Sequence, residues 1–314
     1  KNARMGGRSG SVHVTLAQGN FRHETGPSLL LLPHVYRRIF EECGEKKMKE
    51  YGLVMKPCIP AYQVVFEDGD RLDVGFPRQT KLSPSEQENM EQAEKVSRAK
   101  MDSFERNGSV KWDAYLRACE AYLDCGLPNF IEEKLDLASF PAFLRESLRD
   151  FGKGWPLKPH SDVLDTFFES NKLKALACFQ DLYVGLEPYR NDNQRFGGVL
   201  DSTAPAVFGL LSAIELHPEN KKCGVYAPMG GFQSVSDSLV VLAKECGVNS
   251  RTSTVSKVGP EGVWYRPEQS SGGDSEVVFE PADLIIINAD LPYATQSLVH
   301  DSDPAKEMFN WDDG

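Results

Sequence analysis

The stretch at 224–247, GVYAPMGGFQSVSDSLVVLAKECG, constrains the fold more than any other part of the chain. It predicts a short strand ending at Pro228, a tight turn at Gly230 and Gly231, and then an amphipathic helix. Gly247 is placed to end that helix, because glycine adopts the left-handed conformation that follows many helix C-termini. A paired-glycine turn before a helix lets the backbone approach a flat or charged ligand, although such turns also serve packing alone.

Length, charge and cysteine usage restrict the class of protein. The 314 residues predict about two domains. A formal net charge of −11 argues against a nucleic-acid partner held through phosphate contacts. The seven cysteines and six histidines are scattered without metal-ligand spacing, so we expect reduced, mostly buried thiols and no metal site. The apolar run at 29–32 is far too short to span a membrane.

The N-terminal segment contains two further turns. Gly6, Gly7 and Arg8 precede an alternating apolar pattern at 12–16 that predicts a strand. Glycines followed by arginine suit a phosphate, because backbone N–H groups and a guanidinium both bind anions, although an ordinary loop has the same composition. A glycine–proline pair at 26–27 predicts the second turn.

The middle of the chain alternates between a hairpin and helices. Residues 34–50 show helical spacing, and 57–74 predict a hairpin around an Asp-Gly turn. The polar segment 77–110 predicts a solvated helix that begins after Ser83, with Pro84 in its first turn.

Aromatic and leucine side chains gather at helical spacing between 112 and 179. Such stripes are typical of a helical core, but they also occur along apolar channels and on membrane-surface helices. The phenylalanines concerned are Phe130, Phe140, Phe143, Phe151, Phe167, Phe168 and Phe179, with lysines nearby at 153, 158, 172 and 174.

The C-terminal part predicts more sheet. The segment 251–267 has the pattern of a hairpin, and the apolar run 284–287 is typical of a buried parallel strand. Asn288, Ala289 and Asp290 then form a polar strand end, the place where open α/β sheets bind ligands.

Taken together and in order, these segments resemble a known family. The order is GGR, GPS, YQVVFEDGD, FQDLYVGLEPY, YAPMGGFQSVSDSLV, TVSKV and ADLIIINADLPYA. This set is similar to the bacterial and fungal type of phytoene desaturase, one of the flavin amine-oxidase-like oxidoreductases that also include carotenoid isomerases. The resemblance covers nearly the whole chain and is poorest at 77–110.

The resemblance implies an α/β chain with two kinds of domain. A partial Rossmann-like FAD-binding domain would comprise 1–33 and 224–314, and an α+β substrate domain with a mixed sheet and helices would comprise 34–223. In the family, a strand and a Gly-rich dinucleotide turn precede the GGR segment, and a flavin-binding glycine segment lies near the C-terminus. Their absence here implies an internal fragment that would hold FAD poorly and be inactive by itself.

The resemblance also assigns site residues. His23 and Glu24 stand where relatives more often have Phe-Asp, which retains an acid but lengthens it. Cofactor contacts carried over from the family are the phosphates at Gly6, Gly7 and Arg8, the flavin ring at Gly26 and Pro27, the adenine at Val255, and the FAD-domain strand end at Asn288, Ala289 and Asp290. Substrate contacts carried over are Tyr226, Met229, Gly230, Gly231 and Phe232.

The implied activity is FAD-dependent desaturation of a carotenoid precursor such as phytoene, in which a saturated C–C bond gives a hydride to the flavin and a proton to a base or water. Glu24 is the candidate acid/base, and the alternative is that it supports the neighbouring turn. A polyene hydrocarbon implies a dry channel and a peripheral membrane location, on a cytoplasmic face or in a plastid. Alternatives are a carotenoid cis–trans isomerase, an amine-oxidase-type enzyme, or a non-catalytic fragment.

Overall fold

The computed structural model describes residues 5–78, 81–128, 138, 140–141, 143–145, 158–189, 204–219, 224–267 and 276–299. The chain divides into two compact units, a larger one at 8–238 and a smaller one formed by 1–7 and 239–314. This division does not test which parts bind a cofactor or a substrate, so the predicted domains stay predictions. Helices and small antiparallel sheets occur together, which confirms the mixed α/β class in its general form.

The larger unit begins with an antiparallel hairpin. Strands β1 (Ser11–Leu16) and β2 (Gly19–Glu24) pair along their full length, with Val14 opposite Phe21. Helix α1 (Pro33–Cys43) and the short helix η1 (Met48–Tyr51) follow. The alternation of apolar residues at 12–16 is therefore confirmed as a strand.

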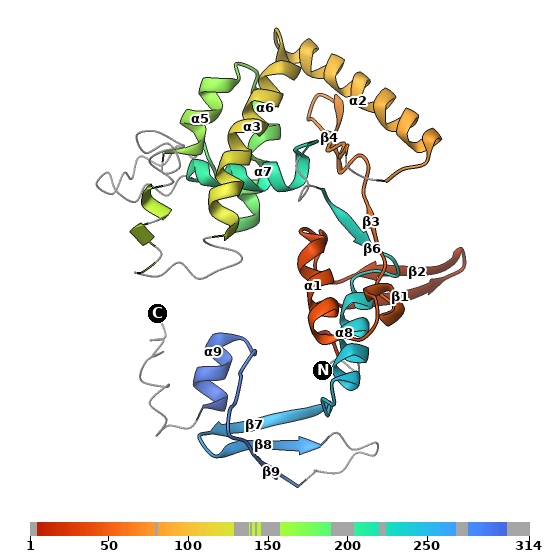
Figure 1. Ribbon diagram of the computed structural model, residues 1–314, viewed down its shortest axis with the longest axis vertical. Helices are drawn as coiled ribbons and strands as arrows, with labels where there is room; N and C mark the ends of the chain where they lie inside the picture. Colours follow the sequence, from red (N-terminus) through yellow and green to blue (C-terminus); the bar gives the residue numbers. More distant parts are fainter. Residues whose placement is uncertain are drawn as a thin grey trace. The chain divides into compact units, whose positions relative to one another are not determined.

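Two segments that are distant in sequence pair next to this hairpin. Strand β3 (Met55–Pro57) pairs antiparallel with β6 (Tyr226–Pro228), and Figure 1 shows the two strands side by side. The backbone of Leu30 bonds to Tyr226 in both directions, at 3.3 and 2.9 Å. The glycine turn after β6 is thereby held against the N-terminal part of the larger unit.

A second hairpin and a long helix confirm two local predictions. Strands β4 (Tyr62–Val65) and β5 (Arg71–Val74) flank the predicted Asp-Gly turn, where Gly69 has φ +86°. Helix α2 (Pro84–Phe104) starts with a capping box, in which Ser83 Oγ accepts from Glu86 N at 3.4 Å and Glu86 Oε2 accepts from Ser83 N at 2.9 Å.

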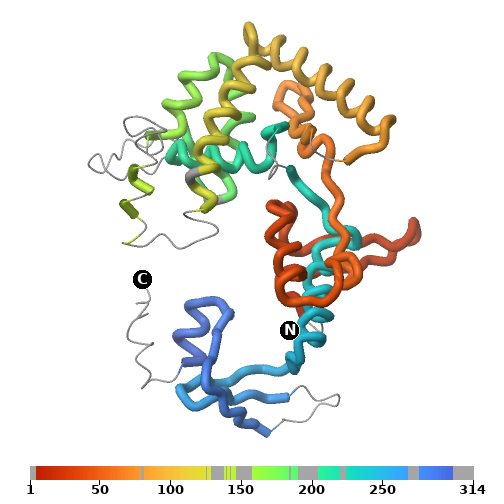
Figure 2. Tube along the Cα trace, in the orientation of Figure 1, coloured from red at the N-terminus to blue at the C-terminus, as the bar shows by residue number. Residues whose placement is uncertain are grey.

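The core of the larger unit is helical. It is formed by α3 (Gly108–Gly126), α5 (His160–Phe167), α6 (Asn171–Cys178) and α7 (Gly209–Leu216), with the short turns η4 (Phe179–Val184) and η5 (Ala206–Phe208). Figure 2 shows the chain turning sharply between α2 and α3. The main buried side chains are Trp112, Tyr115, Leu116, Leu123, Leu164, Phe168, Leu173 and Leu176.

The aromatic stripe is accordingly core at most of its described positions, with Phe140 as the exception. Phe168 is 1% exposed, and Phe167 and Phe179 pack against the same cluster. Phe143 packs against a second small cluster, whereas Phe140 is 46% exposed. Phe130 and Phe151 lie outside the described residues.

Two of the lysines near these aromatics have ion-pair partners. Lys172 pairs with both Asp68 and Asp70 on the β4–β5 turn, and its Nζ lies 4.8 Å from the centre of the Phe104 ring. Lys174 Nζ lies 2.7 Å from Asp165. These contacts tie α6 to neighbouring elements, so the two charges already have a structural role and do not require a membrane surface.

The smaller unit contains the second predicted hairpin. Helix α8 (Gln233–Glu245) crosses into this unit at residue 239, and Gly247 after it has φ +80°, as predicted. Strands β7 (Ser253–Gly259), β8 (Gly262–Pro267) and β9 (Val278–Pro281) then form an antiparallel sheet in that order.

The buried parallel strand predicted at 284–287 is wrong. These residues form no strand, and Leu284 and Ile286 are 80% and 85% exposed. A buried parallel strand needs a neighbouring strand to pair with, and no strand in the described part of the chain lies alongside this run. Asp290 does not end a strand either: its carbonyl accepts from Ala294 N at 2.8 Å, which caps the short helix α9 (Leu291–Tyr293) ahead of η6 (Ala294–Leu298).

Candidate functional site

The glycine turn between β6 and α8 has the predicted geometry. Gly230 and Gly231 adopt φ values of +90° and +83°, in the left-handed region that favours glycine. Met229 N donates to Val54 O at 2.8 Å, and Gly231 N donates to Pro228 O at 2.9 Å. The strand, turn and helix predicted from 224–247 are therefore confirmed.

Glu24 holds this turn from the end of β2. One carboxylate oxygen accepts from Phe232 N at 3.0 Å, at the start of α8. The other oxygen lies 2.9 Å from Arg22 Nε, and Arg22 Nη1 donates to Gly230 O at 2.5 Å. A carboxylate at a helix N-terminus satisfies a backbone N–H that the helix itself leaves unpaired. Glu24 thus contacts the turn at 230–231, which is distant in sequence, and its role in catalysis stays a prediction.

A side chain at Gly231 would disturb this contact. A Cβ on Gly231 would lie 2.1 Å from Glu24 Oε1 and 3.0 Å from Arg22 Cζ. The residue before it has more room, since a Cβ on Gly230 meets only Ser234 Cβ, at 3.7 Å. The Glu24 contact therefore depends on a glycine at 231, and the surface over Gly230 is open to a ligand.

The second turn also makes a close backbone contact. A Cβ on Gly26 would lie 1.8 Å from Arg8 O, so residue 26 has room only for hydrogen. Next to it, the Thr25 N–H and hydroxyl both donate to Gly10 O at 2.9 Å. Two residues assigned to the cofactor, Arg8 and Gly26, are therefore in direct contact, while Pro27 is exposed beside them.

The predicted site residues fall into two groups. The larger unit contains nine of them: Arg8, Glu24, Gly26, Pro27, Tyr226, Met229, Gly230, Gly231 and Phe232. Phe232 is 9% exposed and Met229 46% exposed, so the turn presents one buried and one accessible apolar side chain.

The remaining assigned residues belong to the smaller unit. Gly6 and Gly7 have φ values of +120° and +54°, and Gly7 has open space around it. Val255 lies on β7 opposite Tyr265. Asn288, Ala289 and Asp290 are exposed. No contact in the structure tests their assignment to FAD, which stays a prediction.

Arg22 is a residue of this site that sequence analysis missed. It stands two positions before Glu24 on β2, and side chains two apart on a strand share one face. That spacing within GNFRHE could have indicated the pair, because an arginine next to a glutamate on one face favours an ion pair.

A buried polar network in the larger unit was missed as well. Glu215 is fully buried on α7, and its Oε2 accepts from the Tyr62 hydroxyl at 2.8 Å and from Gln180 Nε2 at 3.3 Å. Burial raises the pKa of Glu215 to about 7, although hydrogen bonds from Tyr62, Gln180 and Tyr183 oppose the rise. Glu215 Oε1 has no hydrogen-bond partner among the described residues.

The network continues into the helical core. Ser212 Oγ lies 3.2 Å from Gln180 Oε1. The Ala177 carbonyl accepts hydrogen bonds from both the Ser212 hydroxyl, at 3.4 Å, and the Tyr115 hydroxyl, at 2.8 Å. His160 lies between Tyr115, at 3.0 Å from Nε2, and Asp181, at 2.7 Å from Nδ1. One glutamate in the apolar segment AVFGLLSAIEL is the only sequence signal for this arrangement.

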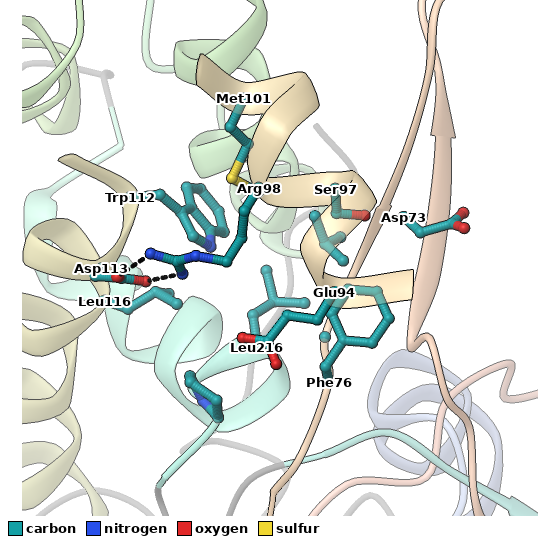
Figure 3. Close-up of a pocket in the computed structure, with 13 residues that line it drawn as sticks. Asp73, Phe76, Glu94, Ser97, Arg98, Met101, Trp112, Asp113, Leu116 and Leu216 are labelled. Atoms are coloured by element: carbon teal, nitrogen blue, oxygen red, sulfur yellow. Dashed lines mark hydrogen bonds and ion pairs between the residues drawn. The ribbon is translucent and has the colours of Figure 1, made fainter. Parts of the chain in front are cut away.

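A small cavity lies between α2, α3 and the end of β5 (Figure 3). Met101, Trp112 and Leu116 form its apolar wall, and Arg98 donates two hydrogen bonds to Asp113 at its edge, at 2.9 and 2.7 Å. About 30 Å³ is open to water, room for one or two water molecules. This cavity is too small to hold a polyene.

The described residues offer neither a metal site nor a membrane-spanning helix. No group of three or more His, Cys, Asp or Glu side chains there is arranged to hold a metal ion. No helix among them is long and apolar enough to cross a membrane. The described cysteines at 43, 58, 119, 178 and 246 form no disulfide, and only Cys119 is buried. The expectation of mostly buried thiols is therefore wrong for these five: Cys43 and Cys246, for example, lie at exposed helix ends.

Two substitutions of Glu24 distinguish support of the turn from acid/base catalysis. Glu24→Gln keeps an oxygen that accepts from Phe232 N, so we expect unfolding stability to fall by less than about 1 kcal/mol. Glu24→Ala removes the cap and should cost about 1 kcal/mol. Urea unfolding of the full-length protein measures both. In a turnover assay, loss of activity in a stably folded Glu24→Gln variant would assign acid/base chemistry to Glu24, whereas retained activity assigns it support of the turn.

Comparison with known proteins shows similarity along almost the whole chain. The chain is 28% identical to the zeta-carotene-forming phytoene desaturase of Myxococcus xanthus, over 94% of this chain and 48% of that protein. It is 25% identical to the carotenoid 3,4-desaturase of Haloarcula japonica, over 100% and 54%. It is 28% identical to the phytoene desaturase of Neurospora crassa, over 95% and 44%.

These matches confirm the resemblance to phytoene and carotenoid desaturases that the sequence predicted. No family model matches the chain. The chain spans about half the length of the curated relatives it matches.

Proposed function

We propose that the protein is a FAD-dependent oxidoreductase that desaturates a carotenoid precursor such as phytoene. The observation that carries the proposal is the similarity to proteins named as phytoene and carotenoid desaturases over 94–100% of this chain. The contacts of Arg8 with Gly26, and of Glu24 with the glycine turn, support it, because residues assigned separately from the sequence lie together.

The proposed architecture is amine-oxidase-like. In this proposal 1–33 and 224–314 contribute to a Rossmann-like FAD-binding domain, and 34–223 form the substrate domain. The β1–β2 hairpin and the start of α8 pack on each other through Glu24, which is consistent with both belonging to one domain.

The residues assigned to FAD fit such a group in two places. Gly6 and Gly7 have left-handed backbone conformations, Gly7 has open space around it, and Arg8 follows, a combination that suits a phosphate. In the second place, Pro27 is exposed next to Gly26, and Gly230, which the resemblance assigned to the substrate, has open space over it. Val255 and 288–290 remain FAD contacts that the resemblance proposes.

FAD, when bound, supplies the hydride acceptor for the desaturation. The chain itself would bind and orient the polyene. Met229 and Phe232 offer apolar surface next to the turn, and Arg22 with Glu24 fixes the positions of Gly230 and Gly231. One oxygen of Glu24 accepts a hydrogen bond and the other forms an ion pair. We therefore assign Glu24 a positioning role, and the proton released in the desaturation goes to water or to another group.

A polyene hydrocarbon is insoluble in water, so we further propose that the protein collects its substrate at a membrane surface. This proposal concerns a peripheral contact only and follows from the substrate class.

Pigment analysis tests the activity. The full-length protein should be produced in cells that make phytoene, and purified in parallel to measure bound flavin by its visible absorbance. We expect phytoene to be converted to products with more conjugated double bonds and longer-wavelength absorption. Unchanged phytoene in cells that contain folded, flavin-bound protein would contradict the desaturase proposal, and changed geometry without added double bonds would indicate an isomerase.

A further inference from the structure

A groove of about 590 Å³ lies in the larger unit, between the first half of α2 and the segment at 56–60. Its volume is within the range of about 300–1,000 Å³ that is usual for small-molecule sites. The apolar lining residues are Pro57, Ile59, Pro60, Phe76, Leu82, Met90 and Ala93, and the polar ones are Lys56, Lys81, Glu86 and Asn89.

Helix α2 forms one wall because of its spacing. One face of this helix carries its four groove-lining residues, because they are spaced three or four positions apart or are adjacent: Glu86, Asn89, Met90 and Ala93. This wall is roughly 10 Å long at 1.5 Å per residue. This wall is long enough for a short linear apolar chain to lie along it.

Phe76 is a buried lining residue of the groove. Its side chain lines both this groove and the small cavity of Figure 3, where it lies beside Glu94. Phe76 is 6% exposed and Met90 is 3% exposed. The bottom of the groove is therefore buried and apolar, and the polar residues lie toward its mouth.

The charges at the groove favour an anion. Neither Lys56 nor Lys81 forms an ion pair with any described residue, and both are exposed. Glu86 is engaged by Ser83, whose hydroxyl and N–H both donate to Glu86 Oε2, at 2.5 and 2.9 Å. Two ammonium groups face one carboxylate that already serves as a helix cap, so the rim carries a net positive charge.

We propose that this groove binds a free medium-chain carboxylate, with the carboxylate at Lys56 and Lys81 and the acyl chain against Ile59, Phe76 and Met90. The proposal is independent of the desaturase function, whose substrate is a hydrocarbon without a charged end. A free acid is favoured over an anionic bilayer because the volume of the groove matches that of a small-molecule site.

Calorimetric titration of the full-length protein with sodium decanoate, below its micelle concentration, tests the site. We expect saturable binding, and binding of 1-decanol that is at least about tenfold weaker because it lacks the charge. Absence of decanoate binding, or equal affinity for decanol, would overturn the proposal. Decanoate binding is measured without turnover, so the result does not depend on the outcome of the pigment assay.

Charge reversals locate the ligand. Lys56→Glu and Lys81→Glu should each weaken decanoate binding at least about tenfold, since both remove an attraction and add a repulsion. Lys95→Glu is the matched control, because Lys95 is an exposed lysine of α2 outside the groove. It should change the affinity less than about twofold. An equal loss in all three variants would show a general charge effect and contradict the site.

A filled groove and a membrane arm complete the test. Ala93→Trp places a bulky side chain in the groove and should abolish binding while the protein keeps its unfolding midpoint; unchanged binding in this variant would refute the location. Co-sedimentation with phosphatidylglycerol vesicles distinguishes the sources of the anion. Vesicle binding that is lost in Lys56→Glu and Lys81→Glu, without any decanoate binding, would replace the free acid with a lipid headgroup and overturn the proposal.

Discussion

Gly26→Ala is expected to lower the free energy of unfolding by about 3 kcal/mol or more and, under the proposed FAD binding, to remove flavin from the full-length protein. The added Cβ would lie 1.8 Å from Arg8 O and 3.3 Å from Ser9 Cα, which is backbone rather than a movable side chain. To admit the methyl group, the segments at 8–10 and 25–26 must separate, and the two hydrogen bonds from Thr25 to Gly10 O would break. Both segments carry residues assigned to the cofactor.

Gly69→Ala is the matched control for this substitution. Gly69 has φ +86°, so an alanine there is strained, but a Cβ on Gly69 would meet nothing within 4 Å. We therefore expect a cost of only about 1 kcal/mol and normal flavin content. Urea unfolding gives the stabilities, and visible absorbance after gel filtration gives the flavin. A Gly26→Ala protein that is as stable as Gly69→Ala would show that the Arg8 contact is looser than the structure indicates.

The features that the sequence predicted correctly are those decided by neighbouring residues. The glycine turn after Pro228, the Asp-Gly hairpin at Gly69 and the capping box at Ser83 each depend on a few consecutive side chains. Backbone conformation and capping act within one turn of the chain, so a local pattern is sufficient to predict them. The same holds for the aromatic stripe, whose helical spacing reports a buried face.

The features that were missed or wrong depend on partners elsewhere in the chain. The run at 284–287 is apolar enough for a buried strand, yet its state is decided by whether other strands pair with it. Arg22 and Glu24 act on a turn more than 200 residues away, at separations of 208 residues each. Local composition contains no information on such pairings, and only the resemblance to a family assigned Glu24 to the site at all.

Glu215 is the clearest case, and its burial has a large expected effect. Its donors Tyr62 and Gln180 come from β4 and η4, so three separate segments create its environment. The pKa of about 7 in the folded protein is above its ordinary value of 4.5, so the folded state binds this proton more tightly than the unfolded state. The resulting stability is fully present below pH 4.5 and is lost as the pH rises through 7, with a total on the order of 3 kcal/mol.

We therefore expect Glu215→Gln to be more stable than the wild type at pH 8, by up to about 3 kcal/mol, and to differ by less than about 1 kcal/mol at pH 5. Glutamine is uncharged at both values and has nearly the same shape as the protonated acid. Glu88→Gln is the matched control, because Glu88 is exposed on α2 and makes the same chemical change. Its stability should follow the wild-type pH dependence between pH 5 and 8, as measured by urea unfolding.

The unpaired oxygen of Glu215 explains why the protonated form prevails in the fold. Tyr62 and Gln180 both donate to Oε2, and Oε1 is buried with no partner among the described residues. An ionised carboxylate would place part of its charge on that buried oxygen, and this desolvation costs more than the hydrogen bonds to Glu215 return. A proton on Oε1 removes this charge and leaves both bonds to Oε2 in place. Parallel pH profiles for the wild type and Glu215→Gln would mean that water reaches Oε1, and would contradict the buried, neutral state.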